Sequence, residues 1–389
     1  MDLNETIESQ SPREPAGLRS GSGLTRLVRG YPRIWAAVVL WLASWAFVSA
    51  FSNLARWETG AQYDGMASLC RWDCNWYGSV AESGYWRTPW RESGSVNWPF
   101  YPLFPMTAYT LRKLSGLSLP SALVLASKLE LLLAIYVFLL MLGDEAETTA
   151  DYFQAASLVA FNPYLIYAHA GYAEPLYFAF ISLGFYFARR QRWIAGGAMG
   201  GLASGTRLVG FLFATSYATL WIKEGRLHSW WRKHDLNRAI GLLLCPLGTA
   251  IFMLYMYHLA GDALVQRHVQ VAWRKIPGNP LNVLRFALRE HHWPRVWAVM
   301  VAASLLLSAW LVKLRKPEMG VFLALSILIP ISASYWAVPR YLWWQPPFLY
   351  AIYRLLGRNS AAWMFYTALA SGMGAFMVVE WFSGHNFVA

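Results

Sequence analysis

Charged residues are scarce in this chain. Only 14% of its 389 residues are charged, whereas 57% are hydrophobic; an average soluble domain is about 25% charged. Several apolar runs reach or approach the length that crosses a bilayer, about 20 residues. The scarcity of charge excludes an ordinary soluble domain, and the apolar runs predict an all-α polytopic membrane protein.

Cysteine is also scarce, with three residues in the whole chain. Cys245 lies in an apolar run and is interpreted as a packing residue. Cys70 and Cys74 flank Asp73, and no second ligand pair follows them, which excludes a zinc signature. Two free thiols are the simpler interpretation. A local disulfide is the alternative if the segment faces an oxidising compartment, since spacing alone leaves the geometry open.

Nucleic-acid recognition motifs are absent, although the net charge is +12. The positive charge falls mostly in short loops between apolar runs, which is the pattern that sets membrane orientation. A glycine-rich stretch at 195–205 lacks the Lys-Ser/Thr that follows a phosphate loop and instead predicts a small-residue face for close helix packing. We therefore expect membrane lipids, and no nucleic acid, among the partners.

The polar N-terminus, residues 1–33, holds five arginines and is interpreted as a disordered cytoplasmic tail. Residues 34–389 are expected to form a single transmembrane domain. Val48-Ser49-Ala50 is compatible with signal-peptidase cleavage, but the long basic tail favours an uncleaved signal anchor. The predicted spans are 34–54, 120–142, 151–168, 174–188, 193–206, 208–222, 239–259, 296–313, 319–336, 346–356 and 361–382.

The orientation follows from the basic loops. The basic loops at 189–192, 223–238, 313–316 and 354–358 fall on the inner side only if residues 98–116 do not cross the membrane. This segment is therefore predicted to be a juxtamembrane helix within a long first outer loop, 55–118. The count is then about eleven spans, with the N-terminus cytoplasmic and the C-terminus outside. A loop this long between spans is usually functional.

A second outer loop, 260–295, breaks the orientation rule because it is strongly basic. One explanation is an anion site: Arg274 and Lys275, among others, would bind a phosphate. The other explanation is that the predicted topology is wrong. Both remain open from the sequence.

The outer face thereby collects Asp73, the arginines Arg207 and Arg340, and the pair His169 and Glu174. A carboxylate near a membrane surface, among cations and aromatic rings, suits group transfer from a phosphate-linked lipid. The carboxylate would take a proton from an acceptor hydroxyl, and the arginines would hold the leaving phosphate. Tryptophans nearby would stack on sugar rings or lie at the lipid headgroups.

Each candidate also has a structural interpretation. Asp73 suits a helix cap or an ion-pair partner, and Asp64 is the rival carboxylate. Glu174 is favourable at a helix N-terminus, and His169 suits a satisfied histidine at the interface. Arginines within or beside membrane spans are different, because they are costly and tend to be functional.

Five motifs in order resemble those of the GPI second-mannose transferases (the PIG-V-like family) and their bacterial relatives. Arg71-Trp72-Asp73 with Trp76-Tyr77, followed by Trp98-Pro99-Phe100-Tyr101-Pro102, is similar to their opening loop. The other four lie at 162–177, 201–207, 270–273 and 339–341, and the similarity covers about residues 34–356. Two positions depart from the family pattern: Ala173 stands where a serine is more common, and Leu208 where a proline is.

This resemblance implies a GT-C-type membrane glycosyltransferase, a helical bundle that uses a polyprenyl-phosphate sugar, expected to be mannose, and inverts the anomeric carbon. It implies that Asp73 is the general base and that a hydroxyl compound, which the sequence does not identify, is the acceptor. The donor phosphate is expected at Arg207, Arg340, Arg274 and Lys275. The other expected substrate contacts are Trp72, Trp76, Tyr77, His169, Tyr172, Glu174, Gln270, Trp273 and Tyr341.

No cofactor is expected. A divalent metal is not indicated, because Asp73 has no clear second acidic ligand nearby in the sequence. The expected location is the plasma membrane if the source is bacterial, with the site on the extracytoplasmic face. Two other functions remain as alternatives: a lipid or solute transporter, favoured by broken helices and intramembrane arginine, and a non-catalytic subunit of a transferase complex.

Overall fold

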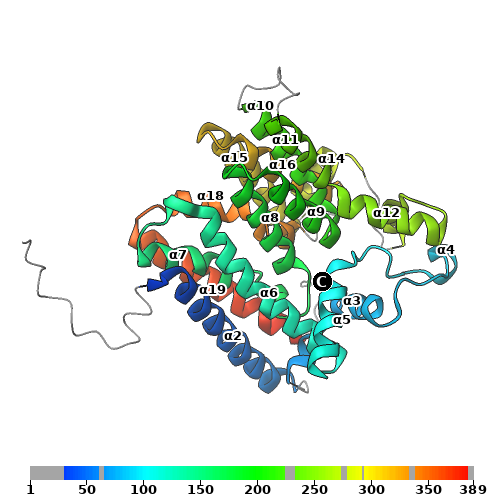
Figure 1. Cartoon of the computed structure of the whole chain (residues 1–389). Helices are drawn as coiled ribbons and strands as arrows, with labels where there is room; N and C mark the ends of the chain where they lie inside the picture. The colour runs from blue at the N-terminus through cyan, green and yellow to red at the C-terminus, as the bar shows by residue number, and fades with distance from the viewer. Residues whose placement is uncertain are drawn as a thin grey trace, which may run out of the picture.

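The structure is a computed structural model of the chain (Figure 1), and it describes residues 30–60, 65–223, 233–272, 278–290, 293–332 and 338–383. Within these ranges every regular element is an α-helix or a 3-10 helix, which confirms the predicted all-α class. Four predicted or rival site residues, and the tail 1–29, lie outside the described residues. These four are Asp64, Trp273, Arg274 and Lys275.

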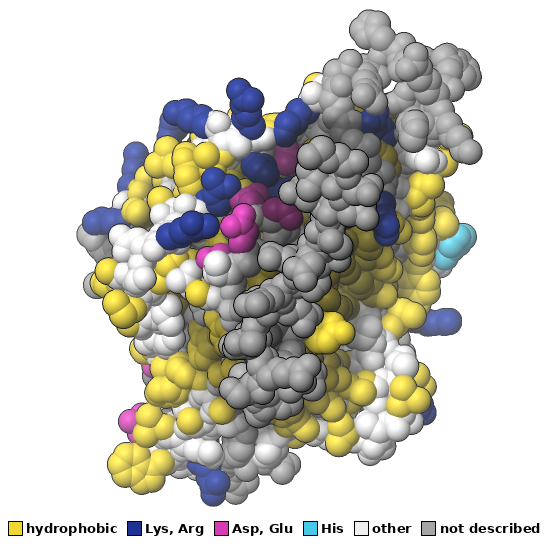
Figure 2. Space-filling view, turned by 60° about the vertical axis from the view of Figure 1, so that its left-hand side comes forward, with side chains coloured by type: hydrophobic (Ala, Val, Ile, Leu, Met, Phe, Trp, Pro, Cys, Tyr) yellow, Lys and Arg dark blue, Asp and Glu magenta, His cyan; other side chains and the backbone are white. Residues whose placement is uncertain are grey.

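Among the described residues, four helices are long and apolar enough to cross a membrane. They are α2 (Pro32–Thr59), α6 (Leu119–Leu142), α15 (Trp293–Lys313) and α19 (Ser360–Ser383). Figure 1 shows α2 alongside α6 and α19. Figure 2 shows hydrophobic side chains on the left and right of the face it draws, with most of the Lys and Arg side chains at its upper end. The protein is therefore an integral, multi-pass membrane protein.

A fifth span is formed if α11 (Lys233–Leu244) and α12 (Leu247–Ala260) are taken together across a 46° bend. Pro246 lies at the break and has no backbone N–H to continue the hydrogen bonds of α11, which accounts for the bend.

Shorter helices occupy the other predicted spans. They are α7 (Thr149–Ala160), α8 (Glu174–Arg189), α9 (Trp193–Thr206), α10 (Phe213–Lys223), α16 (Pro317–Ile331) and α18 (Pro346–Leu356). A helix such as α8, with 16 residues, rises about 24 Å at 1.5 Å per residue, less than the ~30 Å hydrocarbon core. The count of eleven, the inside and outside assignments and the domain division therefore stay predictions.

The first predicted outer loop contains η1 (Gly65–Leu69), α3 (Asp73–Ser83), α4 (Trp90–Ser93) and α5 (Leu103–Ser115). Helix α5 buries one face, with Phe104 and Ala108. Its other side exposes the apolar Met106 and Leu114 together with the polar Lys113. It has 13 residues and ends at Gly116 in the left-handed region, where glycine is favoured. Helix α3 packs against α5 and α6, so this loop forms a helical layer over the start of α6 (Figure 1).

The glycine-rich face of α9 packs closely against α11, as its small residues predict. A Cβ atom added at Gly197 would lie 2.1 Å from the carbonyl oxygen of Gly241, and one added at Gly201 would lie 2.6 Å from that of Leu244. Side chains cannot be accommodated at such distances, so glycine is what allows these backbones to approach.

The remaining elements are short connectors or lie near the candidate site. They are η2 (Gly143–Glu145), η3 (Leu165–Ala168), η4 (Leu208–Leu212), α13 (Val265–His268), η5 (Val269–Val271), α14 (Pro280–Arg289) and α17 (Val338–Trp343).

Candidate active site

Asp73 is the first residue of α3, a position where a carboxylate is favoured by the helix dipole. The residue before it, Trp72, has φ 49° and ψ −115°, a positive-φ conformation outside the αL region that L side chains adopt at a cost of about 1–3 kcal/mol. The Asp73 N–H donates to the Tyr172 hydroxyl at 3.2 Å, and this hydroxyl donates to the Arg71 carbonyl at 3.1 Å. Tyr172 therefore holds the strained turn that presents Asp73.

A disulfide joins Cys70 and Cys74 around this turn. The simpler interpretation, two free thiols, is therefore wrong, and the alternative holds. Spacing alone left this open because a separation of four positions in the sequence does not fix the directions in which the two side chains point. Cys74 is fully buried. A Cβ added at Gly171, which has φ +80°, would lie 2.6 Å from Cys74 Sγ, so the backbone at Gly171 covers the sulfur.

Three other charged side chains meet beside Asp73. Arg340 Nη1, from α17, lies 2.7 Å from Asp73 Oδ2. Arg340 Nε and Arg207 Nη1 both contact Oε1 of Glu174, the first residue of α8. Arg207 directly follows α9. We call Asp73, Glu174, Arg207 and Arg340 the Asp73 cluster.

The Asp73 cluster is largely removed from water. The exposed fractions of its side chains are 0% for Glu174, 10% for Arg340, 12% for Arg207 and 28% for Asp73. Buried charges are tolerated when they are paired, and here two carboxylates and two guanidinium groups balance. The other oxygen of Glu174, Oε2, is buried with no hydrogen-bond partner among the residues that the structure describes. It is an acceptor that no described side chain uses.

Aromatic rings surround the two arginines. The guanidinium carbon of Arg340 lies 4.7 Å from the ring centroids of both Tyr167 and Tyr172, and that of Arg207 lies 4.7 Å from Tyr341. Such contacts stabilise a desolvated cation. Burial by itself lowers the pKa of Arg340, but Glu174 and Asp73 outweigh that effect and hold this pKa above its ordinary value.

The predicted aromatic contacts are packed around the turn. Trp72 meets Trp381 of α19 edge-on at 4.4 Å between ring centroids. Trp76 is stacked on Phe100 at 6.1 Å. Tyr77 is buried and meets the same Phe100 edge-on at 5.0 Å. Trp76 and Tyr77 therefore lie between α3 and the segment before α5, whereas Trp72 packs on α19. The contact of these rings with a sugar stays a prediction.

His169 is close in sequence to Glu174 of the Asp73 cluster, but its side chain contacts a lysine of α6 instead. It is fully buried, and its Nδ1 lies 2.9 Å from Nζ of Lys128 in α6. Sequence reasoning did not single out Lys128. The signal that would have found it is a lysine in the middle of a long apolar run, because ionisable residues inside membrane spans are rare and functional.

The basic loop is described only in part. Gln270 is half-buried and donates to the Gln266 carbonyl at 3.1 Å, and Gln266 in turn contacts the Trp98 carbonyl at 3.4 Å. This part of the loop therefore packs on the segment before α5. The proposed phosphate contacts at Arg274 and Lys275, and the substrate contact at Trp273, lie outside the described residues.

Metal-ligand geometry is not found in the described part of the chain: no group of three or more His, Cys, Asp or Glu side chains there could hold an ion. Both acids of the Asp73 cluster contact Arg340 instead. The expectation on metal dependence stays a prediction.

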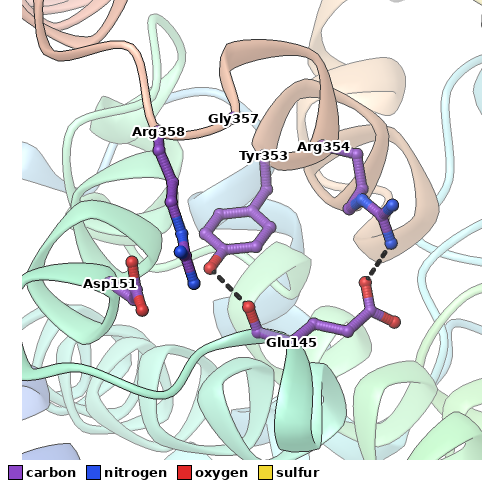
Figure 3. Close-up of a pocket in the computed structure, with 6 residues that line it drawn as sticks. All are labelled: Glu145, Asp151, Tyr353, Arg354, Gly357 and Arg358. Atoms are coloured by element: carbon purple, nitrogen blue, oxygen red, sulfur yellow. Dashed lines mark hydrogen bonds and ion pairs between the residues drawn. The ribbon is translucent and has the colours of Figure 1, made fainter.

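A cavity of about 270 Å³ lies beyond the other end of α6 (Figure 3). Glu145 there contacts Arg354 at 2.7 Å, Lys316 at 3.2 Å and the Tyr350 hydroxyl at 2.7 Å. We call these four residues the Glu145 cluster. Figure 3 shows Tyr353 and Arg354 pointing toward Glu145 from α18. The cluster ties the end of α6 to α16 and α18.

No family model matches the chain, and no curated protein matches it. Among solved structures, ArnT from Cupriavidus metallidurans, bound to undecaprenyl phosphate, is similar at 17% identity with a TM-score of 0.48, over 92% of this chain and 64% of that one. An Archaeoglobus fulgidus oligosaccharyltransferase, in complex with Zn and sulfate, is similar at 14% identity with a TM-score of 0.44, over 85% and 53%. The chain thus spans less than two thirds of either length, and at these scores neither structure assigns it a family or an activity.

Proposed function

We propose that the protein is a GT-C-type membrane glycosyltransferase that moves a sugar, mannose, from a polyprenyl-phosphate donor to a hydroxyl acceptor. Inversion at the anomeric carbon, and a site on the extracytoplasmic face, are parts of the same proposal. The observation that carries it is the Asp73 cluster: a partly exposed carboxylate paired with a buried arginine, among aromatic rings, in a protein built of membrane-spanning helices.

Charge balance supports an exchange of partners at Arg340. The Asp73 cluster is neutral as it stands, so a bound donor phosphate would add an uncompensated negative charge. Asp73 is the most exposed member, at 28%, whereas Glu174 is fully buried. The phosphate therefore displaces Asp73 from Arg340 and leaves Glu174 in place between the two arginines. This exchange frees the Asp73 carboxylate for the acceptor.

The reaction then balances with the residues at hand. Asp73 takes the proton of the acceptor hydroxyl, and the acceptor oxygen forms a bond to the anomeric carbon on the face opposite the phosphate. The bond between that carbon and the phosphate oxygen breaks, and its electron pair leaves with the polyprenyl phosphate. Arg340 and Arg207 stabilise the leaving phosphate.

The test is transfer in vitro by the purified full chain, with labelled polyprenyl-phosphate-mannose and a panel of hydroxyl acceptors, and products identified by mass. We expect a glycosylated product from the wild type and none above background from Asp73→Asn. The variant must elute as the wild type does in detergent. Full transfer by this variant would exclude Asp73 as the base.

The alternatives give different results in the same experiment. A transporter moves labelled lipid between the leaflets of a proteoliposome but makes no new glycosidic bond. A non-catalytic subunit makes none until a partner is added. The observation that favours a transporter is the 46° bend between α11 and α12, because broken helices are common at transporter sites.

A further inference from the structure

A buried lysine lies inside one of the helices that can cross the membrane. Lys128 follows Leu119, the first residue of α6, by nine residues, a rise of about 14 Å that places it well within a ~30 Å hydrocarbon core. It is 1% exposed. No carboxylate within the described ranges forms an ion pair with it. Ionisable side chains at such depth are rare and tend to be functional.

Lys128 contacts His169 and helix α2. Nζ lies 2.9 Å from His169 Nδ1 and 4.4 Å from the ring centroid of Trp45, and the Lys128 carbonyl accepts from Trp41 Nε1 at 2.6 Å. When Lys128 is an ammonium group it has donors and no acceptor, so in that state Nδ1 accepts and the ring carries its proton on Nε2, an atom that is buried with no hydrogen-bond partner among the described residues. Through these contacts Lys128 links α2 and α6 to His169.

His169 begins the segment that reaches the Asp73 cluster. We call residues 169–174 the positioning loop. Its Gly171 covers Cys74 Sγ, and its Tyr172 hydroxyl contacts the Asp73 N–H at 3.2 Å. Its last residue is Glu174. A six-residue loop therefore joins the buried lysine at one end to the proposed base and the buried carboxylate at the other.

We propose that Lys128 and His169 are positioning residues for the proposed transfer reaction: their hydrogen bond holds the positioning loop, which through Tyr172 and Gly171 fixes the turn that carries Asp73. The inference rests on the proposed function for its kinetic part. Neither residue touches the Asp73 cluster directly, so both act through the loop.

Two substitutions at His169 separate the hydrogen bond from the side-chain volume. In His169→Asn the amide oxygen stands one bond beyond Cγ, as Nδ1 does, so the acceptor for Lys128 is kept. In His169→Leu a side chain remains but the acceptor is lost. We expect His169→Leu to lower kcat for sugar transfer by up to about 10²-fold, the effect of a small misplacement, with KM for the donor unchanged. We expect His169→Asn to restore the rate to within about threefold, because it loses only Nε2.

Two substitutions on α6 complete the set. Lys128→Met removes the donor and relieves the buried charge, so it should fold and should match His169→Leu. The double variant should be no slower than either single variant, because both remove one interaction. The control is Glu130→Gln, a neighbouring buried carboxylate that bonds Thr107 at 2.9 Å rather than the positioning loop. It should keep the wild-type kcat.

A second readout does not depend on turnover. Because Gly171 covers Cys74, a loosened positioning loop should expose the Cys70–Cys74 disulfide to a water-soluble phosphine. Reduction is followed by alkylation and mass. We expect faster reduction in His169→Leu and Lys128→Met, and the wild-type rate in His169→Asn and Glu130→Gln.

The inference is overturned if, in His169→Leu, both the rate of disulfide reduction and kcat for transfer equal those of the wild type. It is also overturned if His169→Asn changes both rates as much as His169→Leu does. The second outcome would assign the role to Nε2 instead of the bond to Lys128. A wild type that transfers no sugar but shows the expected order of reduction rates would defeat the proposed function and leave the positioning role standing.

Discussion

A polar cluster that pairs a glutamate with arginine lies near each end of α6, and the two clusters differ in their surroundings. Near its start, the Asp73 cluster holds a fully buried carboxylate between two arginines. Beyond its end, in the Glu145 cluster, Glu145 is 22% exposed and its partner Arg354 is 40% exposed. Each cluster joins helices that are distant in sequence.

The two clusters differ in how their ion pairs affect the stability of the fold. Exposed ion pairs contribute about 0–1 kcal/mol to the stability of the fold. They can connect helix ends at little cost, because water solvates either charge when the pair opens. Buried ion pairs are often no more stabilising than apolar packing of the same volume, yet losing one partner costs about 3–5 kcal/mol. A buried cluster with an unused acceptor oxygen therefore indicates chemistry more than stability. Four predictions test this contrast, in order of expected size.

The largest effect is expected at Asp73. Asp73→Asn should lower sugar transfer by about 10²–10⁴-fold, the usual contribution of a general base. The same variant should bind polyprenyl phosphate more tightly than the wild type, because Arg340 loses the competing carboxylate. Fluorescence or calorimetric titration measures this. Weaker lipid binding by Asp73→Asn would contradict the exchange of partners at Arg340.

Glu174→Gln should be the most destabilising single change in either cluster. It leaves two buried arginines facing one carboxylate, at a cost of about 3–5 kcal/mol, and the apparent melting temperature in detergent should fall accordingly. Pairing it with Arg207→Met, which removes the surplus charge, should recover part of the loss. If the double variant has a lower melting temperature than Glu174→Gln alone, charge balance does not account for the stability of the Asp73 cluster.

Loss of the disulfide should have an intermediate effect. Cys70→Ser with Cys74→Ser opens a short loop, and the chain-entropy relation gives about 2 kcal/mol for five residues. Because Asp73 lies inside this loop, transfer should fall about tenfold, with donor affinity retained. Steady-state kinetics and thermal melting measure the two quantities. Unchanged kinetics would separate the disulfide from the positioning of Asp73.

The smallest effect is expected in the Glu145 cluster. Arg354→Gln removes a partly exposed partner of Glu145, while Lys316 and Tyr350 remain. The free energy of unfolding should change by less than about 1 kcal/mol, and transfer should stay at the wild-type rate. A large kinetic effect here would mean that both ends of α6 serve the reaction.

Much of the architecture was accessible from sequence, because apolar runs longer than a bilayer core leave the backbone no alternative to helix. The predicted bounds of the long spans agree with α2, α6, α15 and α19 to within a few residues, apart from the C-terminal end of α2. The close packing of α9 was also predictable, because small residues on one face of a helix allow another helix to approach. The number of true crossings was not, since helices such as α18, with 11 residues, are shorter than the membrane is thick.

The candidate site was accessible in part. Asp73, Arg207 and Arg340 stood out because charges beside membrane spans are costly wherever they occur. Lys128 was passed over inside a long hydrophobic run. The disulfide between Cys70 and Cys74 was given as the alternative to free thiols, because a spacing of four is compatible with both.

The sequence by itself determined that this protein is helical and lies in a membrane, because hydrophobicity and backbone hydrogen bonding act locally along the chain. Only the tertiary structure decided which charges meet. Asp73 and Arg340 are 267 positions apart, and no local pattern encodes a contact between them. Their pairing depends on how α3, α8, α9 and α17 pack, and on a loop held in place by a lysine buried in α6.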